Sequence, residues 1–260
     1  MLTGASGFHG KHDRAFTLVE ILVVISVVML LLGLSIAALS NARRNAGHVL
    51  DLAGLRDDGA IITAYSGNRD GRVPARFPER DVAGVPGDMV RIDLPEGGWV
   101  VSTYFAHAAS WRIVAHADGF IDERISLPAD YIQGAGSERE LTTLSHAFLA
   151  QPAYWSGDSG AQFKARWRIM RLSEVGSPAL KALVVSSKHR RPRAPGDTTG
   201  IGEEDKITPP LAAAFVDGHA AMVQPERFGP CVPNTLVGIR ASPMLTTKDG
   251  VNGKDVGSES

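Results

Sequence analysis

The sequence has almost no cysteine, and neither sign of charge is in excess. Its single cysteine, Cys231, cannot form an intramolecular disulfide, which excludes a disulfide-stabilised secreted scaffold and a cysteine-based zinc site. The 260 residues include 27 Lys and Arg against 28 Asp and Glu, for a formal net charge of -1. A general nucleic-acid binder needs a basic balance that this chain lacks, so we do not expect nucleic acid as a partner.

Motifs typical of catalysis or cofactor binding are also absent. The sequence contains no HExxH metal motif and no glycine-rich phosphate-binding motif of the GxxxxGK[ST] or GxGxxG type. Residues 156–160, SGDSG, superficially match a serine-protease nucleophile loop, but the chain that follows is too short for the rest of that fold. We therefore predict that the protein is not an enzyme and that it uses no cofactor.

One long uncharged run stands near the N-terminus. Residues 21–40, ILVVISVVMLLLGLSIAALS, contain no charge, and a helix of this length spans about the hydrocarbon thickness of a bilayer. The run is longer than the apolar region of a secretory signal peptide, which has about 7–15 residues. Lys11 and Arg14 precede it, and the positive-inside rule then places the N-terminus in the cytoplasm and the remaining chain across the membrane.

The segment RAFTLVE at residues 14–20 resembles the processing site of type IV prepilins and type II secretion pseudopilins. The resemblance implies that a prepilin peptidase cuts between Ala15 and Phe16, that Phe16 becomes N-methylated, and that Glu20 guides assembly. The family usually has glycine at the position of Ala15. The partners that this resemblance implies are the prepilin peptidase and methyltransferase, other pilin-like subunits, and an assembly platform in the inner membrane.

Elementary electrostatics gives Glu20 a role consistent with this resemblance. A carboxylate at the edge of a membrane segment is costly unless it finds a partner. The free amine at Phe16 of a neighbouring subunit would supply a positive charge, and this pair would select one offset between stacked helices. The alternative is that Glu20 reaches the membrane interface and has no assembly role.

The absence of proline before Pro74 allows one uninterrupted helix, which we predict from about Thr17 to about Tyr65. Its first half is apolar all round, and its second half is amphipathic. In that second half a stripe with spacings of 3, 3, 4 and 3 comprises Val49, Leu52, Leu55, Gly59 and Ile62. Charged residues, including Asp57 and Asp58, are expected on other faces. The turn-forming cluster YSGNRDG at 65–71 ends the helix.

The rest of the chain predicts an α+β body in which an antiparallel sheet packs on the amphipathic half of the helix. Periodicity predicts strands at 89–94, 99–105, 111–115, 163–169 and 180–186, and a short helix at 138–150. The Asp217-Gly218 pair lies between two apolar runs in residues 212–223 and predicts a hairpin.

His189, Asp217 and His219 are the one candidate metal site, and a weak one, because no recognised ligand spacing supports it. The competing interpretation places Asp217 in the hairpin turn and His189 on a surface loop. We predict no metal. His189 and the segment FVDGH at 215–219 also resemble the C-terminal end of planctomycete-type prepilin-like proteins, provided that about residues 191–210 form an insertion.

These features divide the chain into a leader (1–15), a transmembrane half-helix (16–40), an amphipathic half-helix (41–66), an α+β body (67–241) and a flexible tail (242–260). We predict a single-pass inner-membrane protein that assembles into a type II secretion pseudopilus or a type IV pilus-like filament. The alternative is a membrane-anchored extracytoplasmic binding or enzymatic domain that uses a pilin-type export signal without polymerising.

Overall fold

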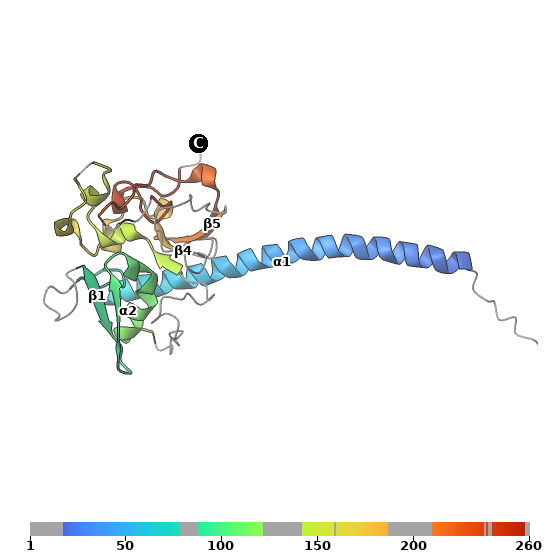
Figure 1. The fold of residues 1–260 in the computed structure, drawn as a ribbon, viewed down its shortest axis with the longest axis horizontal. Helices are drawn as coiled ribbons and strands as arrows, with labels where there is room; N and C mark the ends of the chain where they lie inside the picture. The colour runs from blue at the N-terminus through green and yellow to red at the C-terminus, as the bar shows by residue number, and fades with distance from the viewer. Residues whose placement is uncertain are drawn as a thin grey trace, which may run out of the picture. The chain divides into compact units, whose positions relative to one another are not determined.

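The protein is described by a computed structural model, which describes residues 18–78, 88–121, 142–158, 160–186, 210–236, 238 and 241–257. The chain divides into two compact units, Met1–Gly47 and His48–Ser260. Helix α1, Leu18–Asn68, contributes to both (Figure 1). The structure confirms the α+β class and the long uninterrupted N-terminal helix.

Helix α1 ends where the turn-forming cluster predicts. The amide of Gly71 donates to the carbonyl of Ser66 at 2.8 Å. Asp70 and Gly71 both have positive φ, 55° and 77°, a conformation that stops a helix and that glycine adopts without strain. The chain therefore leaves α1 through a tight left-handed turn, which brings Arg72 beside a later segment of the second unit.

The main sheet of the second unit has four antiparallel strands in the order β3-β4-β5-β6. The strands are β3 (Thr142–Leu144), β4 (Ala182–Ser186), β5 (Leu211–Phe215) and β6 (Ala220–Val223). β5 and β6 form the predicted hairpin, with Ala212 opposite Met222 and Gly218 at φ 93° in the turn. The predicted strand at 180–186 is confirmed as β4.

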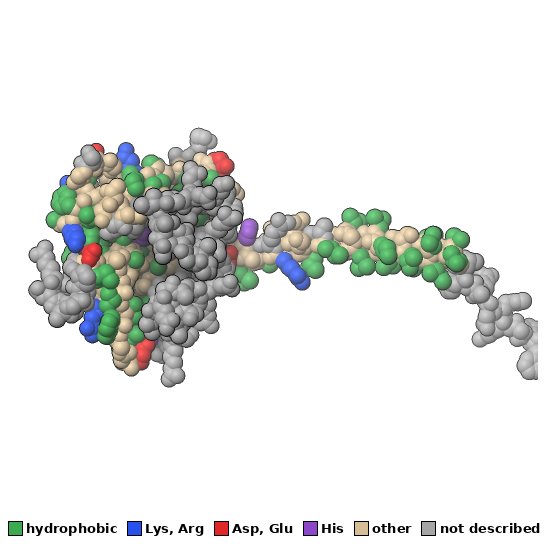
Figure 2. Space-filling model, in the orientation of Figure 1, with side chains coloured by type: hydrophobic (Ala, Val, Ile, Leu, Met, Phe, Trp, Pro, Cys, Tyr) green, Lys and Arg blue, Asp and Glu red, His purple; other side chains and the backbone are tan. Residues whose placement is uncertain are grey.

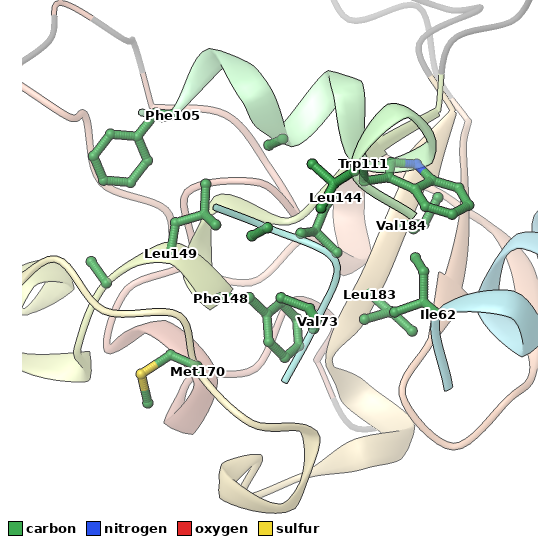
Figure 3. Close-up of a cluster of buried hydrophobic side chains, with 14 of the residues drawn as sticks. Ile62, Val73, Phe105, Trp111, Leu144, Phe148, Leu149, Met170, Leu183 and Val184 are labelled. Atoms are coloured by element: carbon green, nitrogen blue, oxygen red, sulfur yellow. The ribbon is translucent and has the colours of Figure 1, made fainter. Parts of the chain in front are cut away.

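The two faces of this sheet bury different partners, which explains why β4 and β5 are buried along their whole length. On one face Ala212 and Ala214 belong to the same core cluster as Leu55 and Ile62 of α1. A Cβ placed on Gly59 of α1 would lie 3.4 Å from the Cβ of Ala214, so helix and sheet are in close contact here. Figure 3 shows Ile62 beside Leu183 and Val184 of β4.

The opposite face of the sheet is covered by the C-terminal segment. Ala213 and Phe215 of β5 pack with Met244, Leu245 and Val256 in a second core cluster. The prediction of a flexible tail over 242–260 is therefore wrong for residues 242–257, and residues 258–260 lie outside the described residues. This segment is held by isolated bridges and short turns, which leave no periodic pattern in a sequence.

A buried ion pair fixes this C-terminal segment to the sheet. The amine of Lys181 lies 3.2 Å from the carboxylate of Asp255, and both side chains are fully buried. Asp255 also accepts the backbone amide of Ala182 at 2.8 Å and the hydroxyl of Thr247. Burial lowers the pKa of Lys181 and raises the pKa of Asp255, so the two groups depend on each other and on Thr247 to stay charged.

A separate two-stranded sheet pairs β1 (Met89–Asp93) with β2 (Trp99–Thr103), as predicted for 89–94 and 99–105. The predicted strand at 111–115 is wrong, because this segment is helix α2, Trp111–Ala117. Trp111, Val114 and Ala115 share one face at helical spacing and are buried there. A short apolar run does not by itself distinguish a strand from a buried helical turn.

Two further predictions are corrected in the middle of the chain. The predicted helix at 138–150 is strand β3 followed by a 3₁₀ turn at His146–Leu149, and residues 138–141 lie outside the described residues. The predicted strand at 163–169 contains a 3₁₀ turn, Lys164–Arg166, and among the described residues its one β-bridge joins Trp167 to Ala150. Phe163 is 42% exposed, so its alternation with Trp167 does not mark one buried strand face.

Candidate functional site: the N-terminal helix

The first half of α1 consists of exposed apolar side chains. Its most apolar 18-residue window has a mean hydropathy of 2.9, and none of that window is buried. The hydrophobic side chains of this part of the helix are exposed, and Figure 2 shows many of them along its visible face. By length and composition, α1 is the one helix among the described residues that is long and apolar enough to cross a membrane.

The two serines in the middle of this apolar run satisfy their hydroxyl groups within the helix. Ser26 donates to the carbonyl of Leu22 at 2.8 Å, and Ser35 donates to the carbonyl of Leu31 at 2.7 Å. A hydroxyl bonded in this way needs no water, whereas an unbonded polar group in hydrocarbon costs several kcal/mol. The serines are therefore compatible with an apolar environment around the helix.

Glu20 lies in the first turn of α1 as the structure describes it, and its side chain is exposed. Ala15 and Phe16 lie outside the described residues, so the cleavage and methylation sites stay predictions. Glu20 follows Phe16 by four positions, which in a helical register corresponds to about one turn.

The second half of α1 is anchored by a buried acid rather than by apolar contacts alone. Asp58 is 1% exposed, pairs with the guanidinium of Arg112 on α2, and accepts the hydroxyl of Thr142 at 2.6 Å. Burial raises the pKa of Asp58, and the bonds from Thr142 and Arg112 oppose that rise. The expectation that Asp58 lies on a face away from the packed stripe is wrong.

The position of Asp58 was readable from the spacing of its neighbours. It follows Leu55 by three residues and precedes Ile62 by four, which places it on the buried face of the helix. A charge on such a face needs a partner, but the sequence does not identify that partner. Arg112 lies 54 residues further along the chain, and only the tertiary structure brings the two together.

A second polar contact attaches the C-terminal end of α1 to the rest of the second unit. The hydroxyl of Tyr65 donates to Asp118 at 2.5 Å, and Asp118 also pairs with Arg76. Burial and the bond to the Asp118 carboxylate raise the pKa of Tyr65, so this phenol stays protonated at neutral pH. Helix α1 is thus tied to the segment after α2 by polar contacts on its last turn.

The candidate metal residues do not assemble into a site in the described part of the chain. The Nδ1 of His219 lies 2.6 Å from Asp217, and its ring stacks on Phe215 at 4.3 Å, so both residues serve the β5–β6 turn. No group of three or more His, Cys, Asp and Glu side chains among the described residues is arranged to hold a metal ion. His189 lies outside the described residues, so its part in such a site stays untested.

Residues 10–36 match a family model described as the prokaryotic N-terminal methylation motif. The match covers the RAFTLVE segment and most of the uncharged run, and it supports a type IV pilin-like prepilin signal. The motif implies processing by a prepilin peptidase and pilin-type assembly, and with the apolar helix it fits anchoring in the inner membrane. No curated protein and no solved structure matches the chain significantly.

Proposed function

We propose that the protein is a pilin-like subunit that is cut between Ala15 and Phe16, methylated at Phe16, and assembled into a filament. The observation that carries this proposal is the methylation motif at residues 10–36, which continues without interruption into an exposed apolar helix. The second unit then lies on the extracytoplasmic side, and the N-terminus lies in the cytoplasm. The protein has a mechanical role and is not an enzyme.

Assembly depends on the contrast between the apolar first half of the helix and the single acid in that half, Glu20. Apolar helices of neighbouring subunits pack together without water, and a carboxylate among them needs a positive charge nearby. The methylated amine of Phe16 in the next subunit provides that charge. This pair would fix the step between subunits, because any other offset moves the two opposite charges apart.

The filament is a type II secretion pseudopilus or a type IV pilus-like filament, built with other pilin-like subunits on an inner-membrane platform. The resemblance of the RAFTLVE segment to pseudopilins supports the first of these. The rival function, an anchored binding or enzymatic domain that never polymerises, shares the same export signal. The two proposals differ in whether Glu20 is needed for anything beyond insertion.

The experiment compares two acid-to-leucine variants in the native host. Glu20→Leu removes the assembly acid, and Asp57→Leu removes an exposed acid from the second half of the same helix. We expect Glu20→Leu to enter the membrane fraction normally but to give at least ten-fold less filament, measured by shearing or crosslinking. Asp57→Leu should show both normal membrane insertion and the normal amount of filament. Normal assembly of Glu20→Leu would contradict the filament role and favour the anchored domain.

The mature N-terminus provides an independent test. Mass spectrometry of protein isolated from its own cells should find an N-methylated Phe16 as the first residue. An intact Met1, or a cut after the apolar run near Ser40, would overturn prepilin processing itself.

A further inference from the structure

An open cavity on the second unit is lined by three arginines and three hydrophobic residues. Its volume is about 260 Å³, and its lining residues are Arg72, Phe77, Trp167, Arg168, Ile169 and Arg171. No acidic side chain is among them. All six lining residues belong to the second unit, and none of them has a part in the proposed pairing of Glu20 with Phe16.

The backbone forces two of these arginines together. Arg72 and Arg171 face each other across an isolated antiparallel bridge, and the amide of Leu172 donates to the carbonyl of Gly71 at 2.9 Å. The side chain of Arg171 also lies against Gly71, within 3.5 Å of where a Cβ would stand. Like charges directly opposite each other on paired strands are destabilising, so the fold maintains this pair against repulsion.

Neighbouring acids orient two of the three guanidinium groups. Asp70 pairs with Arg171, while Glu174 pairs with Arg168 and accepts the backbone amide of Arg171 at 3.1 Å. These ion pairs are exposed and add little stability, but they restrict where the guanidinium groups lie. In the described part of the chain Arg72 has no ion-pair partner, which leaves three cations against two carboxylates.

The hydrophobic side of the cavity is rigid and partly open to solvent. Trp167 is buried and stacks on Tyr104, with ring centroids 4.6 Å apart. Phe77 packs its ring at 5.5 Å from Tyr104 and is still 48% exposed. The aromatic support fixes the ring of Phe77, so a ligand meets a preformed apolar surface beside the arginines.

We propose that this cavity, the arginine–aromatic cavity, binds a uronic acid, a sugar ring that carries a carboxylate. A guanidinium presents parallel donors that match a planar carboxylate, and Arg72 and Arg171, which face each other across the bridge, both line the cavity. The face of a sugar ring has C–H groups that pack on the exposed ring of Phe77. A volume of about 260 Å³ is slightly below that of pockets for drug-sized ligands and suits a single ring.

The test measures binding to the full chain in detergent by calorimetry. The probes are glucuronate, glucose as the same ring without the carboxylate, and inorganic phosphate as an anion without a ring. We expect glucuronate to bind at least ten-fold more tightly than either control, and to raise the thermal unfolding midpoint of the protein. Equal binding of phosphate would overturn the proposal, because it would show attraction by charge alone, and so would the absence of glucuronate binding.

Variants then locate the site. Arg72→Gln should weaken glucuronate binding at least ten-fold and should not lower the unfolding midpoint, because it relieves the repulsion with Arg171. Phe77→Ala should weaken glucuronate binding and leave phosphate binding unchanged. The control is Arg91→Gln, which removes an exposed arginine that lies over Trp99 outside the cavity. If Arg72→Gln and Arg91→Gln have the same effect, the cavity is not the binding site.

Discussion

The two halves of α1 have the same secondary structure in opposite surroundings. Between residues 18 and 47 apolar side chains such as Ile36 are exposed, whereas in the second half Leu55, Ile62 and Tyr65 are almost completely buried. Because most helical stability in proteins comes from packing of an apolar face, the two halves must obtain it from different sources. The second half obtains it from the sheet, and the first half needs lipid or neighbouring subunits.

Two acids of the helix, Asp58 and Glu20, differ in the same way. Asp58 is buried and has its partners, Arg112 and Thr142, in the same chain. Glu20 is exposed and, in the proposed filament, takes its decisive partner from another subunit. A single helix thus carries one charge that fixes its own fold and another that fixes an assembly.

The largest expected effect comes from shortening the same side chain in each half. Ile62→Ala should lower the free energy of unfolding of the second unit by about 2–5 kcal/mol, because it leaves a cavity against β4. Ile36→Ala, which trims a side chain that is 68% exposed, should change it by less than about 0.5 kcal/mol. Denaturant titration of the full chain in detergent, followed by tryptophan fluorescence, measures both.

All four tryptophans, at positions 99, 111, 155 and 167, lie in the second unit, so the fluorescence reports that unit alone. Similar losses for the two variants would mean that the second half of α1 is not packed more firmly than the first. Ile36→Ala should instead affect filament yield, if neighbouring subunits cover the first half.

An intermediate effect is expected from the buried acid, and it depends on pH. Because burial raises the pKa of Asp58 in the folded state, the native protein binds a proton more readily than the unfolded chain. Stability from this group is therefore gained as the pH falls from 7 toward 4, and it is lost as the pH rises. Relative to Asp58→Asn, the wild-type protein should therefore gain stability over that interval.

The matched control is Asp57→Asn, which removes the exposed neighbouring acid. The charge of Asp57 is the smallest of the causes that raise the pKa of Asp58, so this variant should keep most of the wild-type pH dependence. If acidification instead lowers the stability of the wild-type protein relative to Asp58→Asn, the pKa of Asp58 is lowered by folding rather than raised. The ion pair with Arg112 would then outweigh the cost of burial.

The smallest expected effect distinguishes two glycines of the packed half. Gly54→Ala should raise the free energy of unfolding by about 0.5–1 kcal/mol, because alanine favours the helix and no atom lies within 4 Å of the new Cβ. Gly59→Ala should raise the free energy of unfolding by less, because the new Cβ would lie 3.4 Å from the Cβ of Ala214. An equal gain at both positions would show that helix and sheet are not closely packed at Gly59.

Prediction from sequence succeeded where the signal was local and repeated. The long helix, its end at the turn-forming cluster, the β5–β6 hairpin at Asp217-Gly218 and the strands β1, β2 and β4 were all predicted. It failed for short segments such as 111–115, where a few apolar residues fit either a strand or a helical turn. It also failed for 242–257, whose irregular backbone leaves no pattern although its side chains are buried.

The functional residues likewise fall into a group that a local sequence signal predicts and a group that only the fold brings together. Phe16 and Glu20 are predicted from sequence alone, because the basic leader, the phenylalanine and the acid at fixed spacing form one contiguous signal. The arginine–aromatic cavity has no such signal, because Arg72 and Arg171 are 99 positions apart and meet only across a bridge. Basic residues in a turn-rich stretch look like an ordinary solvated surface until the fold places them together.

By itself, the sequence determined that this chain begins with a membrane-length apolar helix and a prepilin-type signal. Both follow from composition and short-range spacing, since a helix forms from its own hydrogen bonds and apolar character depends on residue type alone. Only the tertiary structure decided which charges are buried, that the C-terminal segment covers the sheet, and which arginines share a cavity. Those outcomes depend on contacts between residues far apart in the chain, which local patterns do not encode.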